Sequence, residues 1–465
     1  MTSIALPASP PQHQHLFSRG LAGVSIGAVA LVSLLAFEAM AVAAAMPAIA
    51  DALQGIGLYA LAFGGMLASS VLGLVWAGRA SDRDGAFRIT AIGLLVFTAG
   101  LLLAGFAPQM GWLVAGRIVQ GLGSGMLGVA LYVGMGQVVP QALHPRLFAL
   151  MAAAWVLPGL VGPLLAAWLV DQLGWRAVFL VVAALVPVAA LLLLPAFGRL
   201  PKPVPKAEAA EGADGAPRAL VRWALLGAAG ALLLHAAGKA GTPPLWMIVA
   251  LLLGLLAAGA AARHLLPRGS LRARPGLPSV IALRGLLAAA FASAEVFLPL
   301  YLTREQGWTL AQAGLCLSAG AVLWSAGSAV QARIGPERDR RRGLQAGFAL
   351  VALGLLLVVT QMLLGPGPTA VWLVVAGWSL TGFGIGLSFP MLSVLTLSLS
   401  ASGEQGGNSS ALQLSDALCS SATLALAGAL FVLVGHGGRL GYVSVLLLSM
   451  ALAALGAWLG RRAFG

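Results

Sequence analysis

The sequence predicts an all-α integral membrane protein that crosses the bilayer fourteen times. Hydrophobic residues make up 60% of the 465 positions and charged residues only 9%, whereas a soluble domain carries about 25% charged residues. A chain of this size needs such a composition if most of its surface faces lipid. Long apolar runs, with most basic residues in the segments between them, support the same class.

A helix needs about 20 apolar residues to cross the hydrocarbon layer. The runs that meet this length form a set of six, a central pair and a second set of six: 21–47, 56–78, 88–107, 111–136, 146–170 and 176–196; 220–238 and 244–262; 279–302, 309–332, 343–364, 368–395, 406–434 and 440–460. Small residues in 37–50 resemble a signal-peptide cleavage site. The long apolar run before them and the many later spans favour a retained first helix.

The basic residues test this count independently. With the amino terminus inside, 22 of the 27 Lys and Arg residues fall in cytoplasmic segments, four in outer loops and Arg117 within a span. The cytoplasmic set includes Arg284, near the start of the ninth span. Because positive residues concentrate on the cytoplasmic side, we expect both termini in the cytoplasm and the chain in the plasma membrane. Twelve spans with an interfacial central hairpin would keep the same charge bias.

The expected organisation follows from these spans and from one polar stretch rich in Pro, Ala, Gly and charge. It comprises a cytoplasmic tail (1–20), a six-helix bundle (21–197), a polar linker (198–219), a two-helix insertion (220–262), a basic loop (263–278) and a second six-helix bundle (279–465).

An internal repeat relates the two sets of six. The fourth span reads AGRIVQGLGSG and a later span reads AGWSLTGFGIG, and four glycines of the first match four of the second at one offset of 261 residues. Such glycines let helices approach closely in lipid, so packing alone would explain their presence. The constant offset indicates duplication. The matched glycines are Gly116, Gly121, Gly123 and Gly125 with Gly377, Gly382, Gly384 and Gly386.

The loop between the second and third spans reads GRASDRDG and contains Gly78, Asp82, Arg83 and Gly85. Glycine permits a tight turn, and Asp82 can accept hydrogen bonds from helix amides or pair with an arginine. The spacing resembles the Gly-x-x-x-Asp-Arg-x-Gly signature of the major facilitator family. The resemblance implies two six-helix bundles with the substrate site between them, and a latch for the inward-closed state at this loop. A solvated turn that only fixes topology is the alternative.

Arg117 opens the sequence RIVQGLG in the fourth span, which resembles the family's Arg-x-x-Gln-Gly-x-Gly motif. An arginine buried in a span is costly and usually functional, and the resemblance implies a part in proton coupling. Because Arg117 lies about two turns into its helix, a side chain that reaches the outer interface is the alternative.

The fifth span contains WVLPGLVGP, with Pro158, Gly162 and Pro163. This sequence resembles the antiporter motif of the family, although alanines replace the usual closing glycines. Pro163 is expected to bend the helix and free a carbonyl. The resemblance favours export over import, whereas a packing kink would explain only the bend.

Glu38 stands nine residues before Pro47, where fourteen-helix drug exporters of this family carry an Asp. Met40 and Ala43 replace the Thr and Asn of those exporters. With the two-helix insertion, the chain resembles the fourteen-helix drug:proton antiporters of the multidrug efflux type. The resemblance implies proton-coupled export of hydrophobic or amphipathic, drug-like molecules by alternating access, and with it antibiotic resistance.

Three of the fourteen acidic residues lie inside predicted spans: Glu38, Glu295 and Asp416. An ionised carboxylate is costly in hydrocarbon, so such a group can hold a proton in one access state and release it in the other. Glu295 follows Glu38 by 257 residues, about one helical turn from strict equivalence at the repeat offset. Glu38 is the first candidate for proton coupling, and Arg117, Glu295 and Asp416 are further candidates. Local pairing with a hydroxyl or an arginine is the alternative for each acid.

Aromatic and methionine side chains within spans can form an adaptable hydrophobic cleft, although each can equally face lipid. The candidates for the substrate cleft are Met40, Tyr132, Trp155, Phe291, Trp324 and Trp378.

Other functional classes have less support. The sequence has no nucleophile–base pair, phosphate-binding loop or metal-ligand spacing, so we expect no enzyme, cofactor or metal. The net charge of +13 does not indicate nucleic acid, because the basic residues lie in short loops. The expected partners of a monomeric chain are protons, a small-molecule substrate and the bilayer. A lipid or glycolipid exporter, a proton-coupled nutrient importer and a membrane sensor are the rival functions.

Overall fold

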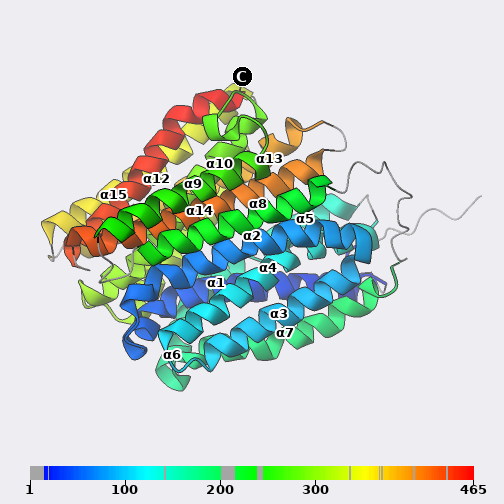
Figure 1. The fold of residues 1–465 in the computed structure, drawn as a ribbon, viewed down its shortest axis with the longest axis horizontal. Helices are drawn as coiled ribbons and strands as arrows, with labels where there is room; N and C mark the ends of the chain where they lie inside the picture. The colour runs from blue at the N-terminus through cyan, green and yellow to red at the C-terminus, as the bar shows by residue number, and fades with distance from the viewer. Residues whose placement is uncertain are drawn as a thin grey trace, which may run out of the picture.

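A computed structural model describes residues 15–18, 20–140, 143–200, 215–237, 244–334, 337–365, 367, 370–401, 404–435 and 438–464. These residues form an all-helical fold (Figure 1). The helices are α1 (Ala22–Ala52), α2 (Tyr59–Asp84), α3 (Ala86–Gly105), α4 (Met110–Val138), α5 (His144–Ala153), α6 (Val156–Leu173), α7 (Arg176–Phe197), α8 (Gly215–Ala237), α9 (Pro244–Leu265), α10 (Leu277–Arg304), α11 (Leu310–Gln331), α12 (Glu337–Leu364), α13 (Ala370–Ser398), α14 (Gln405–Gly435) and α15 (Arg439–Leu459).

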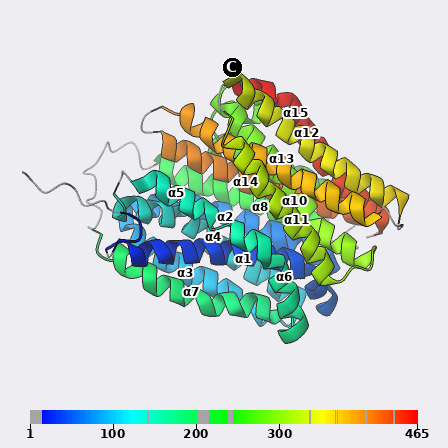
Figure 2. The same ribbon diagram turned by 180° about the vertical axis from the view of Figure 1, so that it is seen from behind.

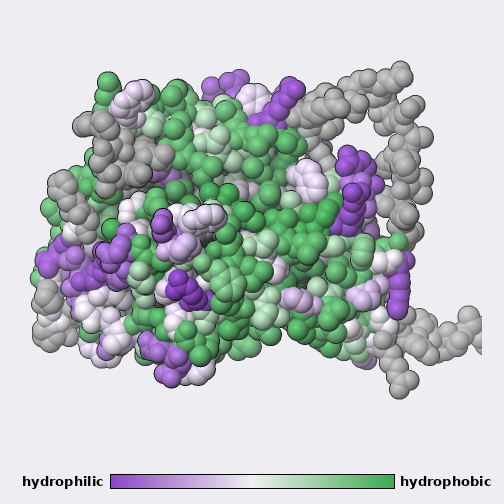
Figure 3. Space-filling view, turned by 60° about the horizontal axis from the view of Figure 1, so that its bottom comes forward, coloured by the Kyte–Doolittle hydropathy of each residue, from purple (hydrophilic) through white to green (hydrophobic). Residues whose placement is uncertain are grey.

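Thirteen helices of the described residues are long and apolar enough to cross a membrane. The surface agrees, because Figure 3 shows a mostly hydrophobic middle with hydrophilic residues concentrated towards the two ends of the molecule. The apolar part of α8 is shorter, Leu220–His235. It nevertheless packs along α9 and against α2 and α14 (Figure 1). The predicted all-α membrane fold is therefore confirmed.

The fifth predicted span is wrong in one respect, because it is two helices instead of one. α5 ends at Ala153 and α6 begins at Val156. A proline ring clashes with the carbonyl four residues before it and offers that carbonyl no N–H, and Pro158 stands four residues after Ala154. The Oγ of Ser33 on α1 donates a hydrogen bond of 3.1 Å to the freed Ala154 carbonyl. Pro163, where the sequence predicts a bend, lies inside α6, so the interruption between the two helices falls before Pro158.

Two bundles form the molecule, and we call them the N-half (α1–α7) and the C-half (α10–α15). Within the N-half, α4 packs on α2 and α3, and α1 packs on α6 and α7; in the C-half, α13 packs on α11 and α12 in the same way. The halves meet where α2 lies against α14 and α6 lies against α11 (Figure 2). The "linker end" of the molecule is where α7 ends and α8 begins, and the "distal end" is the opposite one, where α1 and α10 end.

The matched glycines explain why the halves resemble each other. A Cβ on Gly121 would lie 2.1 Å from the Met66 carbonyl oxygen of α2, and a Cβ on Gly382 would lie 2.1 Å from the Gly320 carbonyl oxygen of α11. Only glycine allows these helix pairs to approach so closely. The other matches repeat the pattern, with Gly116 and Gly123 against α3, Gly377 and Gly384 against α12, Gly125 against α2 and Gly386 against α11.

Polar contacts join the halves at the distal end. Asp51, at the end of α1, forms an ion pair with Arg304, at the end of α10. The hydroxyl of Tyr59 on α2 donates a hydrogen bond of 2.9 Å to the Val296 carbonyl of α10. These contacts hold the distal ends of the two halves together in this conformation.

Candidate functional site

Glu38 and Arg117 meet in the interior of the N-half. Glu38 lies midway along α1 and is 1% exposed, and Arg117 lies near the distal end of α4 and is 2% exposed. The Nη1 of Arg117 donates a hydrogen bond to the Glu38 carboxylate. The alternative of an arginine that reaches the outer interface is therefore wrong, because its guanidinium is buried and paired.

Two further contacts fix the guanidinium of Arg117. Its Nε donates to the Ala62 carbonyl of α2 at 3.2 Å, and its Nη1 also donates to Gln120 Oε1 at 3.0 Å. The Phe63 ring lies 6.0 Å from its central carbon. The pair is thus anchored to α1, α2 and α4 at once.

Two buried polar atoms beside this pair lack partners. Glu38 Oε2 and Gln120 Nε2 have no hydrogen-bond partner among the described residues. An unpaired buried polar atom is costly, so this place is suited to a proton or a bound molecule. Gln120 is part of the fourth-helix motif in the sequence, but it was not predicted as a site residue. Its contact with Arg117 arises because residues three apart lie on the same face of a helix.

Glu295 lies apart from Glu38, partly exposed on α10. None of the described residues hydrogen-bonds to its carboxylate. One turn earlier on α10, the Phe291 ring stacks on Trp378 of α13 with centroids 5.2 Å apart and meets Trp324 of α11 at 5.3 Å. Trp324 also contacts Phe389, at 5.6 Å. The structure therefore brings together three of the predicted cleft residues, one helical turn from a carboxylate.

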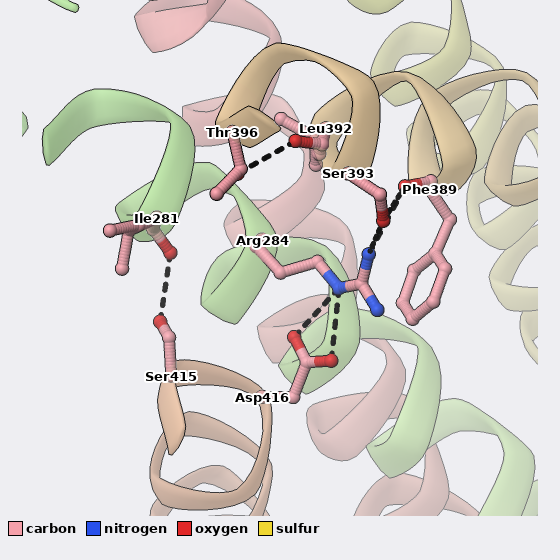
Figure 4. A network of polar contacts seen from close by, with 8 residues as sticks. All are labelled: Ile281, Arg284, Phe389, Leu392, Ser393, Thr396, Ser415 and Asp416. Carbon is pink, nitrogen blue, oxygen red and sulfur yellow. Dashed lines mark hydrogen bonds and ion pairs between the residues drawn. The ribbon is translucent and has the colours of Figure 1, made fainter. Parts of the chain in front are cut away.

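Asp416 pairs with an arginine, which is the alternative that the sequence left open for each acid within a span. Both carboxylate oxygens of Asp416 on α14 accept from Nε of Arg284 on α10 at 2.9 Å (Figure 4). Nη1 of the same arginine donates to the Phe389 carbonyl at 3.1 Å and to Ser393 Oγ at 3.0 Å, both on α13. The assignment of Arg284 to a cytoplasmic segment is wrong, because it is a buried residue of α10. Its ion pair joins α10, α13 and α14.

The two halves differ at matching positions. Adding the repeat offset to Ala154 and Trp155, at the break between α5 and α6, gives Ser415 and Asp416. In the C-half these residues lie inside a continuous α14, and Ser415 Oγ donates to the Ile281 carbonyl of α10 at 2.8 Å. One half thus has a helix break supported by Ser33, while the other has an intact helix held by an ion pair.

The α6 segment whose sequence resembles the antiporter motif lies at the contact between the halves. The carbonyl oxygen of Pro163 would be 3.0 Å from a Cβ on Gly314 of α11, and Gly162 lies close to Met40 of α1. Pro158 lines an apolar groove of about 400 Å³ between α1, α6 and α7. Ser33 and Phe37 of α1 also line this groove.

The remaining cleft candidates do not join the aromatic cluster of the C-half. Trp155, at the helix break, is 45% exposed, and Tyr132 on α4 is also 45% exposed. Met40 packs near Gly162 at the contact of α1 with α6. A single six-residue cleft is therefore not formed in this conformation.

The loop motif is only partly described. Gly85 has a φ of +86° between α2 and α3, a conformation that favours glycine. Arg83 donates two hydrogen bonds to Asp84, at 2.8 and 3.2 Å, and Arg88 lies 3.7 Å from the same carboxylate. The hydrogen bonds from Arg83 hold the pKa of Asp84 below its ordinary value. The side chain of Asp82 lies outside the described residues, and Gly78 has open space around its Cα.

The arrangement suits proton binding within the membrane. A carboxylate that is paired with an arginine stays charged, and the same carboxylate takes a proton when the arginine moves away. Across the described part of the chain, no group of three or more His, Cys, Asp or Glu residues could hold a metal ion. The paired charged side chains can form and break ion pairs, and a carboxylate can take up a proton when its partner moves away.

Comparison with known proteins identifies the family. The sequence profile of the Major Facilitator Superfamily matches residues 26–423, which is most of the chain. A protein of Mycobacterium tuberculosis named "probable multidrug-efflux transporter" is 30% identical over 394 residues, which cover 82% of this chain and 81% of that protein. A "probable actinorhodin transporter" of Streptomyces coelicolor is 29% identical, over 91% of this chain and 74% of that protein.

Another relative is longer than this chain. An uncharacterised transporter of the same superfamily from Mycobacterium tuberculosis is 29% identical over 378 residues, which cover 77% of this chain but 52% of that protein. The chain thus spans about half the length of that relative. Among solved structures, a POT family transporter in complex with 5-aminolevulinic acid superposes with a TM-score of 0.70 at 14% identity, over 93% of this chain and 94% of that one. At this identity the likeness concerns the fold alone.

Proposed function

The chain belongs to the Major Facilitator Superfamily, and from that premise we propose that it is a proton-coupled exporter of hydrophobic or amphipathic small molecules. It is a multi-pass membrane transporter, and some of its relatives are named for multidrug or antibiotic transport. The proposal adds three points to this: protons as the driving ion, drug-like compounds as substrates and export as the direction.

One observation carries the proposal: Glu38, a carboxylate midway along a membrane helix, is paired with Arg117, and its other oxygen has no partner among the described residues. Binding of a proton to Glu38 would cancel the charge that holds Arg117 in place. Because the same guanidinium contacts α2 and Gln120, a change at Glu38 reaches three helices. A coupling group must act in this way, since its protonation has to favour one access state over the other.

The C-half contributes a second set of candidate residues. Asp416 and Arg284 form an ion pair that links three helices, and the side chain of Asp416 keeps 23% of its surface exposed. Within the part of the chain that the structure describes, Glu295 has no such partner. It stands one turn from the aromatic cluster of Phe291, Trp324 and Trp378. We assign Asp416 to a conformation-dependent ion pair and Glu295 to contact with the polar or cationic part of a substrate.

Side chains that suit a hydrophobic substrate lie in both halves. The aromatic cluster lies on α10, α11 and α13, and Met40 faces the Gly162–Pro163 segment of α6. Aromatic and methionine side chains adapt to ligands of different shape. This supports a broad class of apolar substrates in preference to a single polar nutrient.

The proposed topology puts the linker end in the cytoplasm of the cell, with the protein in the plasma membrane and functional as a monomer. In this orientation the ion pair of Asp51 with Arg304 closes the outer side. The linker would be the cytoplasmic connection between two six-helix bundles, and α8 with α9 the two-helix insertion.

A lipid or glycolipid exporter is the second candidate, and the apolar groove between α1, α6 and α7 favours it. The groove has a volume of about 400 Å³ and lies among membrane-spanning helices, where an acyl chain could enter it. A nutrient importer has no comparable observation in its favour.

Transport into inverted vesicles separates these candidates. Vesicles that contain the protein are given a proton gradient and a panel of cationic dyes, neutral dyes and fluorescent lipids. The proposal predicts dye accumulation that stops when the gradient is collapsed. Accumulation of lipid alone would favour the second candidate, and accumulation of neither, with confirmed insertion, would contradict both.

A further inference from the structure

The inserted helix α8 places a histidine at the contact between the two halves. His235 is 7% exposed and its ring lies directly on Gly64 of α2, where a Cβ would be 1.8 Å from its Nε2. The Gly64 carbonyl accepts a hydrogen bond of 2.8 Å from Ser421 Oγ on α14. The imidazole therefore packs where an N-half helix and a C-half helix are joined.

The ring of His235 borders a small cavity. The cavity has a volume of about 20 Å³, which is enough for one water molecule. Nε2 of His235 is buried and has no partner among the described residues. The lining comes from three parts of the fold, with Gly57 and Tyr59 of the N-half, Phe297 and Gly428 of the C-half, and His235 of the insertion.

No described charged side chain lines this cavity. Tyr59 of α2 is the other titratable group in the lining, and its hydroxyl is bound to the Val296 carbonyl. The charged groups of the neighbouring helices lie elsewhere. Asp82 and Asp84 stand at the linker end of α2, and Asp416 of α14 is paired with Arg284. On α9, Arg263 and His264 stand at the linker end. At the distal end, Asp51 and Arg304 form an ion pair, and Glu305 and Arg439 stand at the end of α10 and the start of α15.

We call the space beside Gly64 of α2 that the His235 ring fills the notch. The neutral ring fits this notch, but the protonated ring does not. A neutral imidazole can fill an apolar notch, because it carries no net charge that needs a partner. An imidazolium would be an unpaired charge in apolar surroundings, which is strongly unfavourable. Protonation therefore favours any arrangement in which the ring leaves the notch and reaches water.

We propose that His235 is a proton-binding site by which the inserted α8–α9 hairpin controls opening of the distal end. With a neutral ring, the hairpin fills the notch between α2 and α14 and keeps the distal ends together. With a protonated ring, the hairpin withdraws from Gly64 and the two halves are free to separate there. The insertion is then a working part of the transporter, and this step does not depend on Glu38.

Distances between spin labels test the proposal. One label is placed at Gln109 and one at Leu440, exposed positions at the distal end of each half. Cysteines are introduced at both positions after Cys316 and Cys419 are changed to Ala, and each new cysteine is spin-labelled. The distance is measured on the full chain in lipid nanodiscs by double electron–electron resonance spectroscopy. An exposed histidine titrates near pH 6.5. As the pH falls through this region, the population with the longer distance should rise by up to about tenfold per pH unit, the limit for one coupled proton.

The variants decide the result. His235→Leu fills the notch with a side chain that cannot take a proton, so the shorter distance should persist at every pH. Gly64→Ala should expel the ring and give the longer distance already at neutral pH. His264→Leu, a change at the exposed histidine of α9, should leave the parental response intact. An unchanged pH response in His235→Leu would overturn the proposal.

A Glu38→Gln background separates this proposal from the proposed coupling group. If the response persists in that background and is lost only with His235→Leu, the site is independent of Glu38, as proposed. If Glu38→Gln alone removes the whole response, the distal opening is controlled by Glu38 and the proposal for His235 is wrong.

Discussion

Arg117 and Glu38, which are 79 residues apart in the chain, form an ion pair that is almost completely shielded from solvent. Each lies on a different helix of the N-half, and Arg117 is also bonded to a third. Buried ion pairs contribute little net stability, because desolvation offsets their attraction. Their retention in a membrane helix bundle is better explained by function, and the predictions below test this and the related features of the fold.

The ion pair of the C-half predicts a loss and a recovery of stability. Arg284→Met leaves the Asp416 carboxylate unpaired, and breaking a buried pair typically costs about 3–5 kcal/mol. Because the Asp416 side chain keeps 23% exposure, we expect about 3 kcal/mol, seen as a lower Tm in detergent. Arg284→Met with Asp416→Asn should recover most of the loss, and Arg268→Met, at an exposed position, should change little. Equal Tm values for Arg284→Met and Arg268→Met would contradict the structure.

The close approach of α4 to α2 predicts that Gly121→Ala is destabilising. The new Cβ would lie 2.1 Å from the Met66 carbonyl oxygen, so the two helices must separate. Overpacking of this kind costs about 1–3 kcal/mol. Gly136→Ala is the matched control on the same helix, because a Cβ there meets no atom within 4 Å. Thermal unfolding measured in detergent should show a lower Tm for Gly121→Ala and an unchanged Tm for Gly136→Ala.

The loop between α2 and α3 predicts different effects for its two acids. Asp82→Asn should lower transport at near-normal membrane expression, because Asp82 holds the family's signature position. Asp84→Asn removes the shared partner of Arg83 and Arg88 and should affect transport less. Full activity of Asp82→Asn would reduce the loop to a topology signal.

The pH dependence of the Asp84 contact follows from its pKa. Because this pKa is lowered in the folded protein, the stabilisation is fully present above the ordinary value of about 3.9 and is lost as the pH falls through the lowered value. The Arg83–Asp84 contact should thus be intact throughout the physiological range. Titration of Asp84, followed by NMR with labelled aspartate, should give an apparent pKa below that of an exposed aspartate, and a higher value would contradict the contact.

The topology predicts the location of the two ends of the inserted hairpin. A reporter fused near Lys239, which lies outside the described residues, should read outside the cell, and one near Arg268 should read inside. This result requires α8 to cross the membrane, although its apolar part is shorter than that of α9. If both reporters read inside, the hairpin lies at the interface and the chain crosses twelve times.

Most of the fold could be predicted from the sequence because the bilayer imposes a strict length and composition on each helix. The repeat was visible because close helix contacts require glycine at fixed spacing, as at Gly121 and Gly382. The break between α5 and α6 was missed. The apolar run there is continuous, and the expected bend was assigned to Pro163 instead of Pro158, whose ring opposes the Ala154 carbonyl.

The site was predicted less completely, because it depends on which helix faces lie together. Glu38 and Arg117 each stood out as charges within spans, yet their contact follows from the packing of α1 on α4. Arg284 was counted among the cytoplasmic residues because it lies near the start of its span, where hydropathy cannot distinguish a buried side chain from a cytoplasmic one. His235 gave no signal, since a single histidine near a helix end is common and only its packing on Gly64 marks it.

The central claim is that Glu38 exchanges protons during transport, and substrate-induced proton release from vesicles tests it most directly. The assay compares the parental protein with Glu38→Gln, Glu38→Asp and Arg117→Ala at equal expression, with a panel of cationic and neutral dyes as substrates. Gln keeps the shape of a protonated Glu but cannot release a proton, so Glu38→Gln should insert normally and release none. Glu38→Asp should retain partial release, and Arg117→Ala should be impaired because the carboxylate loses its partner. Proton release by Glu38→Gln at the parental rate would contradict the claim and direct attention to Glu295 and Asp416.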